Sequence, residues 1–210
     1  MKFCSKISPT VTLEAVSYTQ KKPMCVFGCL MSERGRQIKQ EMLSWIVSKY
    51  DVVCVNQEYP GKLFEYPALY FAKLYSEQKC ASVLYLHTKG AFNPSNVYGQ
   101  VQTRRMWEEE FIDHYEWYQT IVANDKLAVA APFVSDAPWG VTWTNGFIAG
   151  PGAWKNAVVR PPESPHDRYV YEFIFKGVNY TPYSRIFSGV NHVEDYIFER
   201  MKSYINTIQV

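Results

Sequence analysis

An apolar run that stops at ionisable side chains is the part of this sequence best suited to chemistry. Residues 82–90 read Ser-Val-Leu-Tyr-Leu-His-Thr-Lys-Gly, which predicts a buried strand ending at His87, Lys89 and Gly90. In open α/β sheets, ligands bind at the carboxyl ends of the strands. An ammonium group there can neutralise phosphate oxygens, and a glycine lets a ligand come close to the backbone. The alternative is that His87 ends a strand and Lys89 is a solvated loop residue.

Strands and helices alternate in the sequence around this run. Apolar runs predict strands at 24–30, 51–55 and 83–86, and apolar residues at helical spacing predict helices over 38–49 and 67–74. Such alternation implies crossover connections and a parallel sheet. We therefore predict an α/β fold, a single-domain Rossmann-like and mostly parallel sheet flanked by helices.

The length of 210 residues fits one domain, residues 1–210. Residues 1–22 have no strong periodicity and are predicted to be an N-terminal extension or an edge strand. Further strands are predicted at 127–131 and 141–149, and a closing helix at 194–205.

A long helix is predicted after the loop at residues 91–99. Its Phe111, Tyr118 and Val122 share one face with Tyr115, and Arg104 lies two turns before Phe111 in the same row. We expect the guanidinium group of Arg104 to point towards the sheet.

Composition limits the classes of function. Hydrophobic residues make up 47% and charged residues 20%, which is typical of a globular protein, and a net charge of +2 disfavours nucleic acid as the principal partner. No window approaches a membrane span of about 18 apolar residues, and no apolar leader segment begins the sequence. Five cysteines, mostly in or beside apolar runs, fit a reducing compartment. The sequence predicts a soluble, cytoplasmic protein without a transmembrane segment.

The third predicted strand and its neighbours resemble a glycosyltransferase of the GT-A type. In that fold, a strand of the form apolar-apolar-Tyr-Leu-Asp-x-Asp ends in two carboxylates that hold a divalent metal on the donor's diphosphate. Here the corresponding residues 84–90 read Leu-Tyr-Leu-His-Thr-Lys-Gly. The chain is more closely similar to small glycosyltransferase-like proteins, common in polysaccharide-building gene sets, that carry His-Thr-Lys-Gly at this place. The resemblance covers residues 60–155, including Tyr-Pro-Ala-Leu at 66–69 and the helix that contains Arg104.

This resemblance implies a nucleotide-diphosphate sugar donor and a carbohydrate or lipid-linked acceptor in surface polysaccharide synthesis. His87, Lys89, Gly90 and Arg104 would bind the donor diphosphate. Because an ammonium group can replace a bridging cation, the site needs no cofactor, although His87 can still ligate a divalent metal such as Mn²⁺ or Mg²⁺.

A second group of candidate residues follows at 136–150. In the resembling enzymes a segment of this kind lines the acceptor and the donor sugar. Trp139 and Trp143 can stack on a sugar face, Asn145 can hydrogen-bond hydroxyls, and Gly146 keeps the wall thin. Alternatively, both tryptophans are core residues, and Asn145 and Gly146 form a bulge or a hairpin turn.

Inverting sugar transfer needs a carboxylate that takes the proton of the acceptor hydroxyl. Asp167 is the first candidate, Asp136 the second, and Glu172 lies one turn after Asp167. Each is equally compatible with a helix cap or a surface position. His192 is a further polar candidate, although a metal-ligand role is doubtful without an acidic pair.

Two other functions remain open. The absence of an Asp-x-Asp pair favours a non-catalytic, transferase-like module that binds a glycan or a partner protein. Another nucleotide-binding α/β enzyme is the weaker alternative, because neither a Gly-x-Gly-x-x-Gly fingerprint nor a Walker loop follows the first apolar run.

Overall fold

The computed structural model describes residues 11–58, 63–91, 97–134, 142, 145–163, 171 and 173–186. Its strands are β1 (Val11–Ser17), β2 (Met24–Leu30), β3 (Asp51–Gln57), β4 (Val83–His87), β5 (Ala128–Ala130), β6 (Phe147–Ala149) and β7 (Thr181–Tyr183). Its helices are α1 (Glu33–Lys49), α2 (Tyr66–Lys79), α3 (Val97–Glu108), the π-helix η2 (Glu109–Asp113), α4 (Tyr115–Asn124) and α5 (Pro151–Asn156).

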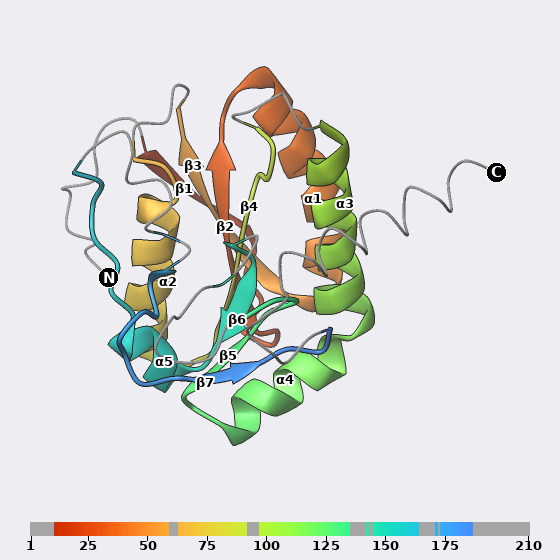
Figure 1. The fold of residues 1–210 in the computed structure, drawn as a ribbon. Coiled ribbons are helices and arrows are strands. Elements are labelled where there is room, and N and C mark those ends of the chain that lie inside the picture. The colour runs from red at the N-terminus through yellow and green to blue at the C-terminus, as the bar shows by residue number, and fades with distance from the viewer. Residues whose placement is uncertain are drawn as a thin grey trace.

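The described part of the chain forms three layers, with one sheet between two sets of helices. Figure 1 shows α2 and α5 on one face of the sheet and α1, α3 and α4 on the other. The α2 face buries Tyr85, Phe147 and Trp154, and the α1 face buries Phe27 and Phe111. The α/β class with flanking helices is therefore confirmed.

The predicted mostly parallel sheet is wrong. The strand order is β1-β3-β2-β4-β6-β5-β7. The pairs β2–β3, β2–β4 and β5–β7 are parallel, but β1–β3, β4–β6 and β5–β6 are antiparallel. The misjudgement has a physical cause: β5 and β6 are three-residue strands buried throughout, and a fully buried apolar run looks the same whichever way it points. At the other end of the strand order, β1 is an edge strand, which is one of the two alternatives predicted for residues 1–22.

The order in which successive strands join the sheet reverses at β2. The strand that follows, β3, pairs on one side of β2, and the next strand, β4, pairs on its other side. The connecting helices α1 and α2 accordingly lie on opposite faces of the sheet (Figure 1). A reversal of this kind leaves a crevice at the carboxyl ends of the strands, the usual position of ligands in such sheets.

The predicted long helix is interrupted by one π-helical turn. His114 donates its backbone N–H to the carbonyl of Glu109, five residues earlier, so α3 and α4 are separated by η2. Phe111, Tyr118 and Val122 are buried as predicted, whereas Tyr115 is only half-buried. The predicted helix at 194–205 lies outside the described residues.

Helix α1 begins directly after β2, and Gly35 makes this close connection possible. The side chain of Ser32 caps the helix by accepting a hydrogen bond from the N–H of Gly35, at 3.0 Å. A Cβ atom on Gly35 would fall on the carbonyl oxygen of Leu30. The end of β2 and the first turn of α1 are therefore packed backbone to backbone.

Replacing Gly35 by alanine should lower the free energy of unfolding by about 1–3 kcal/mol, because the new methyl group must push the helix away from Leu30. Urea denaturation measures the effect. The control is Gln37→Ala at an exposed position of the same helix, where alanine favours the helix slightly. Equal stability of both variants would show that the turn at 30–35 adapts without cost.

Candidate functional site

A cavity of about 90 Å³ opens at the carboxyl ends of β2, β3 and β4. The strands contribute Gly28, Gln57 and His87, the turn after β4 contributes Lys89, and the start of α2 contributes Glu65. The further lining residues are Cys29, Leu30, Val55, Phe64, Pro67, Ala68, Tyr85, Thr88, Gly90, Ala91 and Gln100. The cavity therefore occupies the crevice that the strand order creates, and it contains three of the four residues predicted to bind a diphosphate.

Lys89 lies on a turn that is fastened to the sheet. Thr88 donates its N–H to the carbonyl of Gly28 at 2.9 Å, and its hydroxyl accepts the N–H of Leu30 at 3.0 Å. The N–H of Ala91 donates to the carbonyl of Thr88 at 3.0 Å and closes the turn. Lys89 is therefore presented at the cavity by a backbone with fixed geometry.

Gly90 is required by this turn and by its packing against α3. Its φ of +94° is a conformation that side-chain-bearing residues rarely adopt. A Cβ atom at this position would lie 2.9 Å from Cδ of Gln100. Gly90 thus allows Gln100 to lie close to the backbone, and the predicted approach of a ligand at Gly90 stays a prediction.

Arg104 is buried, with 5% of its surface exposed, and its guanidinium group contacts α1 and the Lys89 turn. Nε and Nη2 donate to the two carboxylate oxygens of Glu41 at 3.0 and 3.1 Å, and Nη1 donates to the carbonyl of Lys89 at 2.9 Å. Arg104 is not among the residues that line the cavity. It positions the turn, and its predicted contact with a diphosphate stays a prediction.

His87 is held between aromatic rings. Its ring stacks on that of Tyr85, with centroids 6.0 Å apart, and meets the edge of Trp107 at 5.3 Å. Trp107 in turn packs on Gly146, where a Cβ atom would clash with the indole ring, lying 2.8 Å from its Cζ2 and closer still to Cε2 and Nε1. The structure therefore brings Gly146 close to His87 through Trp107, so the thin wall predicted at Gly146 accommodates an indole ring.

Asn145 lies beside Gly146 at the start of β6. Its φ is +57°, it is buried, and its Oδ1 has no hydrogen-bond partner among the described residues. It does not line the cavity, so its contact with a sugar stays a prediction. The remaining candidates lie outside the described residues: Asp136, Trp139, Trp143, Asp167, Glu172 and His192.

The cavity residues that the sequence argument missed include Gln57, Glu65 and Tyr85. Gln57 ends β3, just as His87 ends β4, and its amide joins the sheet to the carbonyl of Phe64 at 2.9 Å and the N–H of Leu63 at 3.0 Å. A polar residue at the end of an apolar run was the signal used for His87, and it was present here too. Glu65 and Tyr85 gave no such signal, because one precedes a helix and the other sits inside the apolar run.

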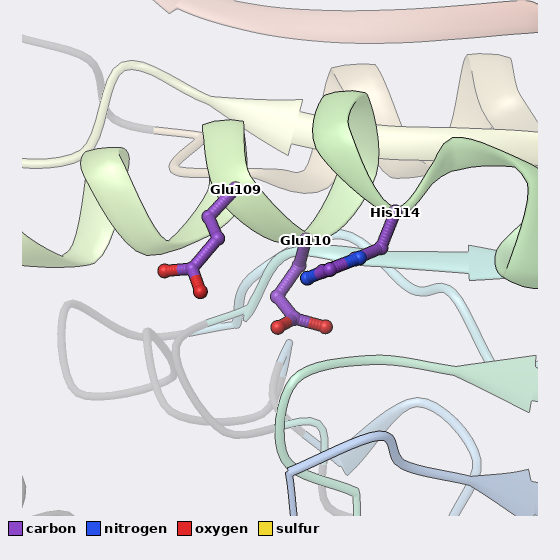
Figure 2. Close-up of side chains that lie close together, drawn as sticks. All are labelled: Glu109, Glu110 and His114. Carbon is purple, nitrogen blue, oxygen red and sulfur yellow. The ribbon is translucent and has the colours of Figure 1, made fainter.

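A second group of ionisable residues lies on η2, outside the cavity lining. Figure 2 shows Glu109, Glu110 and His114 extending from the same side of the helix, with the ring of His114 beside Glu110. Their ligand atoms lie within 4.8 Å of one another, close enough to hold a metal ion. However, the buried carboxylate of Glu110 already accepts a hydrogen bond from Tyr118 at 2.8 Å and pairs with Arg185 at 3.3 Å. Protein groups therefore satisfy its charge.

The fold and the cavity define a mixed α/β protein with a cavity at the carboxyl ends of its central parallel strands. Comparison with family models, with curated proteins and with solved structures finds no match for this chain. Within the described part of the chain, no helix has the length and apolar character needed to cross a membrane.

Arg104→Lys should lower the free energy of unfolding by about 1–3 kcal/mol, because an ammonium group cannot bind both oxygens of Glu41 and the Lys89 carbonyl together. Chemical denaturation at low and high salt measures the loss. The control is Arg105→Lys at the exposed neighbouring position. If both variants behave alike, the contacts of Arg104 contribute nothing to stability.

Proposed function

We propose that this protein is a glycosyltransferase with a GT-A-like arrangement. It moves a sugar from a nucleotide-diphosphate donor to a carbohydrate or lipid-linked acceptor. The observation that carries the proposal is the cavity at the carboxyl ends of β2, β3 and β4, with Lys89 on a turn at its edge. The resemblance of residues 84–90 to the metal-binding strand of GT-A enzymes points to the same segment.

The charge of the cavity suits a diphosphate that leaves during the reaction. As the acceptor oxygen forms its bond to the anomeric carbon, the bond from that carbon to the diphosphate breaks, and negative charge develops on the departing oxygen. An ammonium group fixed beside this oxygen stabilises that charge without a metal. Lys89 is the one lysine or arginine among the described residues that line the cavity. We assign it this role, with His87 as a second donor.

The acceptor hydroxyl must also lose its proton to a base. Asp167 and, next, Asp136 remain our proposals for this carboxylate.

A non-catalytic binding module is the second candidate. One observation favours it: Arg104, proposed as a second cation, forms an ion pair with Glu41, so less positive charge faces the cavity than a diphosphate would require. The two functions differ in turnover. Release of nucleoside diphosphate from a panel of nucleotide sugars in the presence of carbohydrate acceptors supports the enzyme, and glycan binding without any release supports the module.

Lys89→Ala should weaken the binding of nucleoside diphosphates by about 10- to 100-fold, the usual effect of losing a charge-assisted hydrogen bond. Calorimetry with ADP, CDP, GDP, TDP and UDP measures the affinities. Lys89→Arg keeps the charge and should retain most of the binding. Lys79→Ala, exposed at the far end of α2, is the control. Unchanged affinity in Lys89→Ala would remove Lys89 from the site.

Chelation by EDTA tests the metal-free form of the proposal. Turnover by the wild-type protein should persist in EDTA, because Lys89 takes over the charge neutralisation that a cation performs in the resembling enzymes. Complete dependence on Mn²⁺ would contradict this form of the mechanism.

A further inference from the structure

The hydroxyl group of Tyr85 is a buried polar group at the cavity. Tyr85 is fully buried in β4 and lines the cavity, and its Oη has no hydrogen-bond partner among the residues that the structure describes. A buried hydroxyl without a partner is unfavourable for folding. The described packing around Tyr85 therefore gives no reason for a hydroxyl group at this position.

Gly28 leaves open the space beside this hydroxyl. An alanine Cβ at position 28 would lie 3.6 Å from Tyr85 Oη and 3.0 Å from Cβ of Ala68. Gly28 itself lines the cavity, and its φ is not in the region that requires glycine. The absence of a side chain at position 28 therefore leaves a place 3.6 Å from Tyr85 Oη without a protein atom.

Glu65 provides a second polar group at this end of the cavity. Glu65 precedes α2 and lines the cavity, and its Oε2 is buried. Burial, followed by the nearby charge of Glu65, raises the pKa of Tyr85 well above its ordinary value. Tyr85 thus stays a neutral hydroxyl that can donate a hydrogen bond, whereas an ionised Glu65 can only accept one.

A hydrogen-bond donor and a hydrogen-bond acceptor at one place determine which chemical group of a ligand can bind there. A phosphate oxygen only accepts hydrogen bonds and is repelled by Glu65, and an ammonium group only donates. A hydroxyl group does both through one oxygen atom. We propose that Tyr85 and Glu65 recognise a single hydroxyl group of the ligand. Tyr85 donates a hydrogen bond to the oxygen of this hydroxyl, and Glu65 accepts a hydrogen bond from it.

This inference rests on the proposed function, in which the ligand is a nucleotide sugar. Its hydroxyl groups come from two sources, the ribose and the transferred sugar. Both present the same chemistry to Tyr85 and Glu65, so deoxy analogues of each part must be compared.

The experiment measures affinities of the nucleoside diphosphate that binds best, of its 2′-deoxy and 3′-deoxy forms, and of nucleotide sugars lacking single sugar hydroxyls. The wild-type protein should reject one of these analogues by about 10²-fold or more, since a site built for a hydroxyl leaves its polar groups unpaired without it. In Tyr85→Phe the affinity for the complete ligand should fall about tenfold, and most of that discrimination should disappear. The rejected analogue identifies the ribose or the sugar.

Thermal stability without ligand gives an independent readout. Tyr85→Phe should raise the melting temperature of the ligand-free protein by about 2–4 °C, because it removes a buried hydroxyl that has no partner among the described residues. The matched control is Tyr50→Phe, also fully buried but donating its hydroxyl to the carbonyl of Phe111 at 3.2 Å. That control should lower the melting temperature and leave ligand affinity unchanged.

Gly28→Ala is the second variant, because its methyl group occupies the space beside Tyr85 Oη. It should weaken binding of the complete ligand more than binding of the rejected analogue. Nucleotide binding with equal affinities for all analogues, full discrimination in Tyr85→Phe, or a lower melting temperature of that variant would overturn this inference alone. If the wild-type protein binds no nucleotide, the proposed function fails and the inference falls with it.

Discussion

The buried guanidinium group of Arg104 connects the parts of the protein on which the site depends. It binds both carboxylate oxygens of Glu41 on α1 and the carbonyl of Lys89 after β4, so it joins two helices and the turn at the cavity. A planar fork with several donors can hold three acceptors in fixed directions, which a lysine cannot do. Because Glu41 balances the charge, Arg104 can be buried at this position without an unpaired cation.

The strand order then determines where a ligand can be reached. The crevice beside β2 results from the strand order, but its chemistry comes from a few residues at the strand ends. These are Gln57 at the end of β3, His87 at the end of β4 and Lys89 in the turn that follows β4. Gly28 and Gly90 act differently. Gly90 satisfies a backbone conformation and the proximity of Gln100, whereas Gly28 leaves a space that the protein itself does not fill.

The sequence predicted β2, α1, β3, α2 and β4 well, because their apolar periods differ clearly between strand and helix. It located the cavity at residues 87–90, since a strand ending in charged residues is a local signal. It did not predict the directions of β5 and β6, which depend on pairing between distant segments. It also did not predict the contact between Arg104 and Glu41, 63 residues away, because spacing alone shows only which face of a helix a side chain occupies. Tyr85 was missed for a related reason: inside an apolar run, a tyrosine is indistinguishable from core packing.

Tyr85 and Arg104 represent opposite ways of burying a polar group. Every hydrogen-bonding nitrogen of Arg104 finds a protein acceptor, so its burial contributes to a rigid turn. The Tyr85 hydroxyl lies in the same end of the sheet, yet the described residues give it no acceptor. Phenylalanine would fill the same volume without that cost, and stability alone would favour it. A polar group that weakens the folded state at the cavity, beside a glycine that keeps the space open, is consistent with a requirement imposed by the ligand. In the proposed site the turn and the hydroxyl have complementary roles, since the turn fixes the position of the Lys89 charge and the Tyr85 hydroxyl recognises the ligand group next to it.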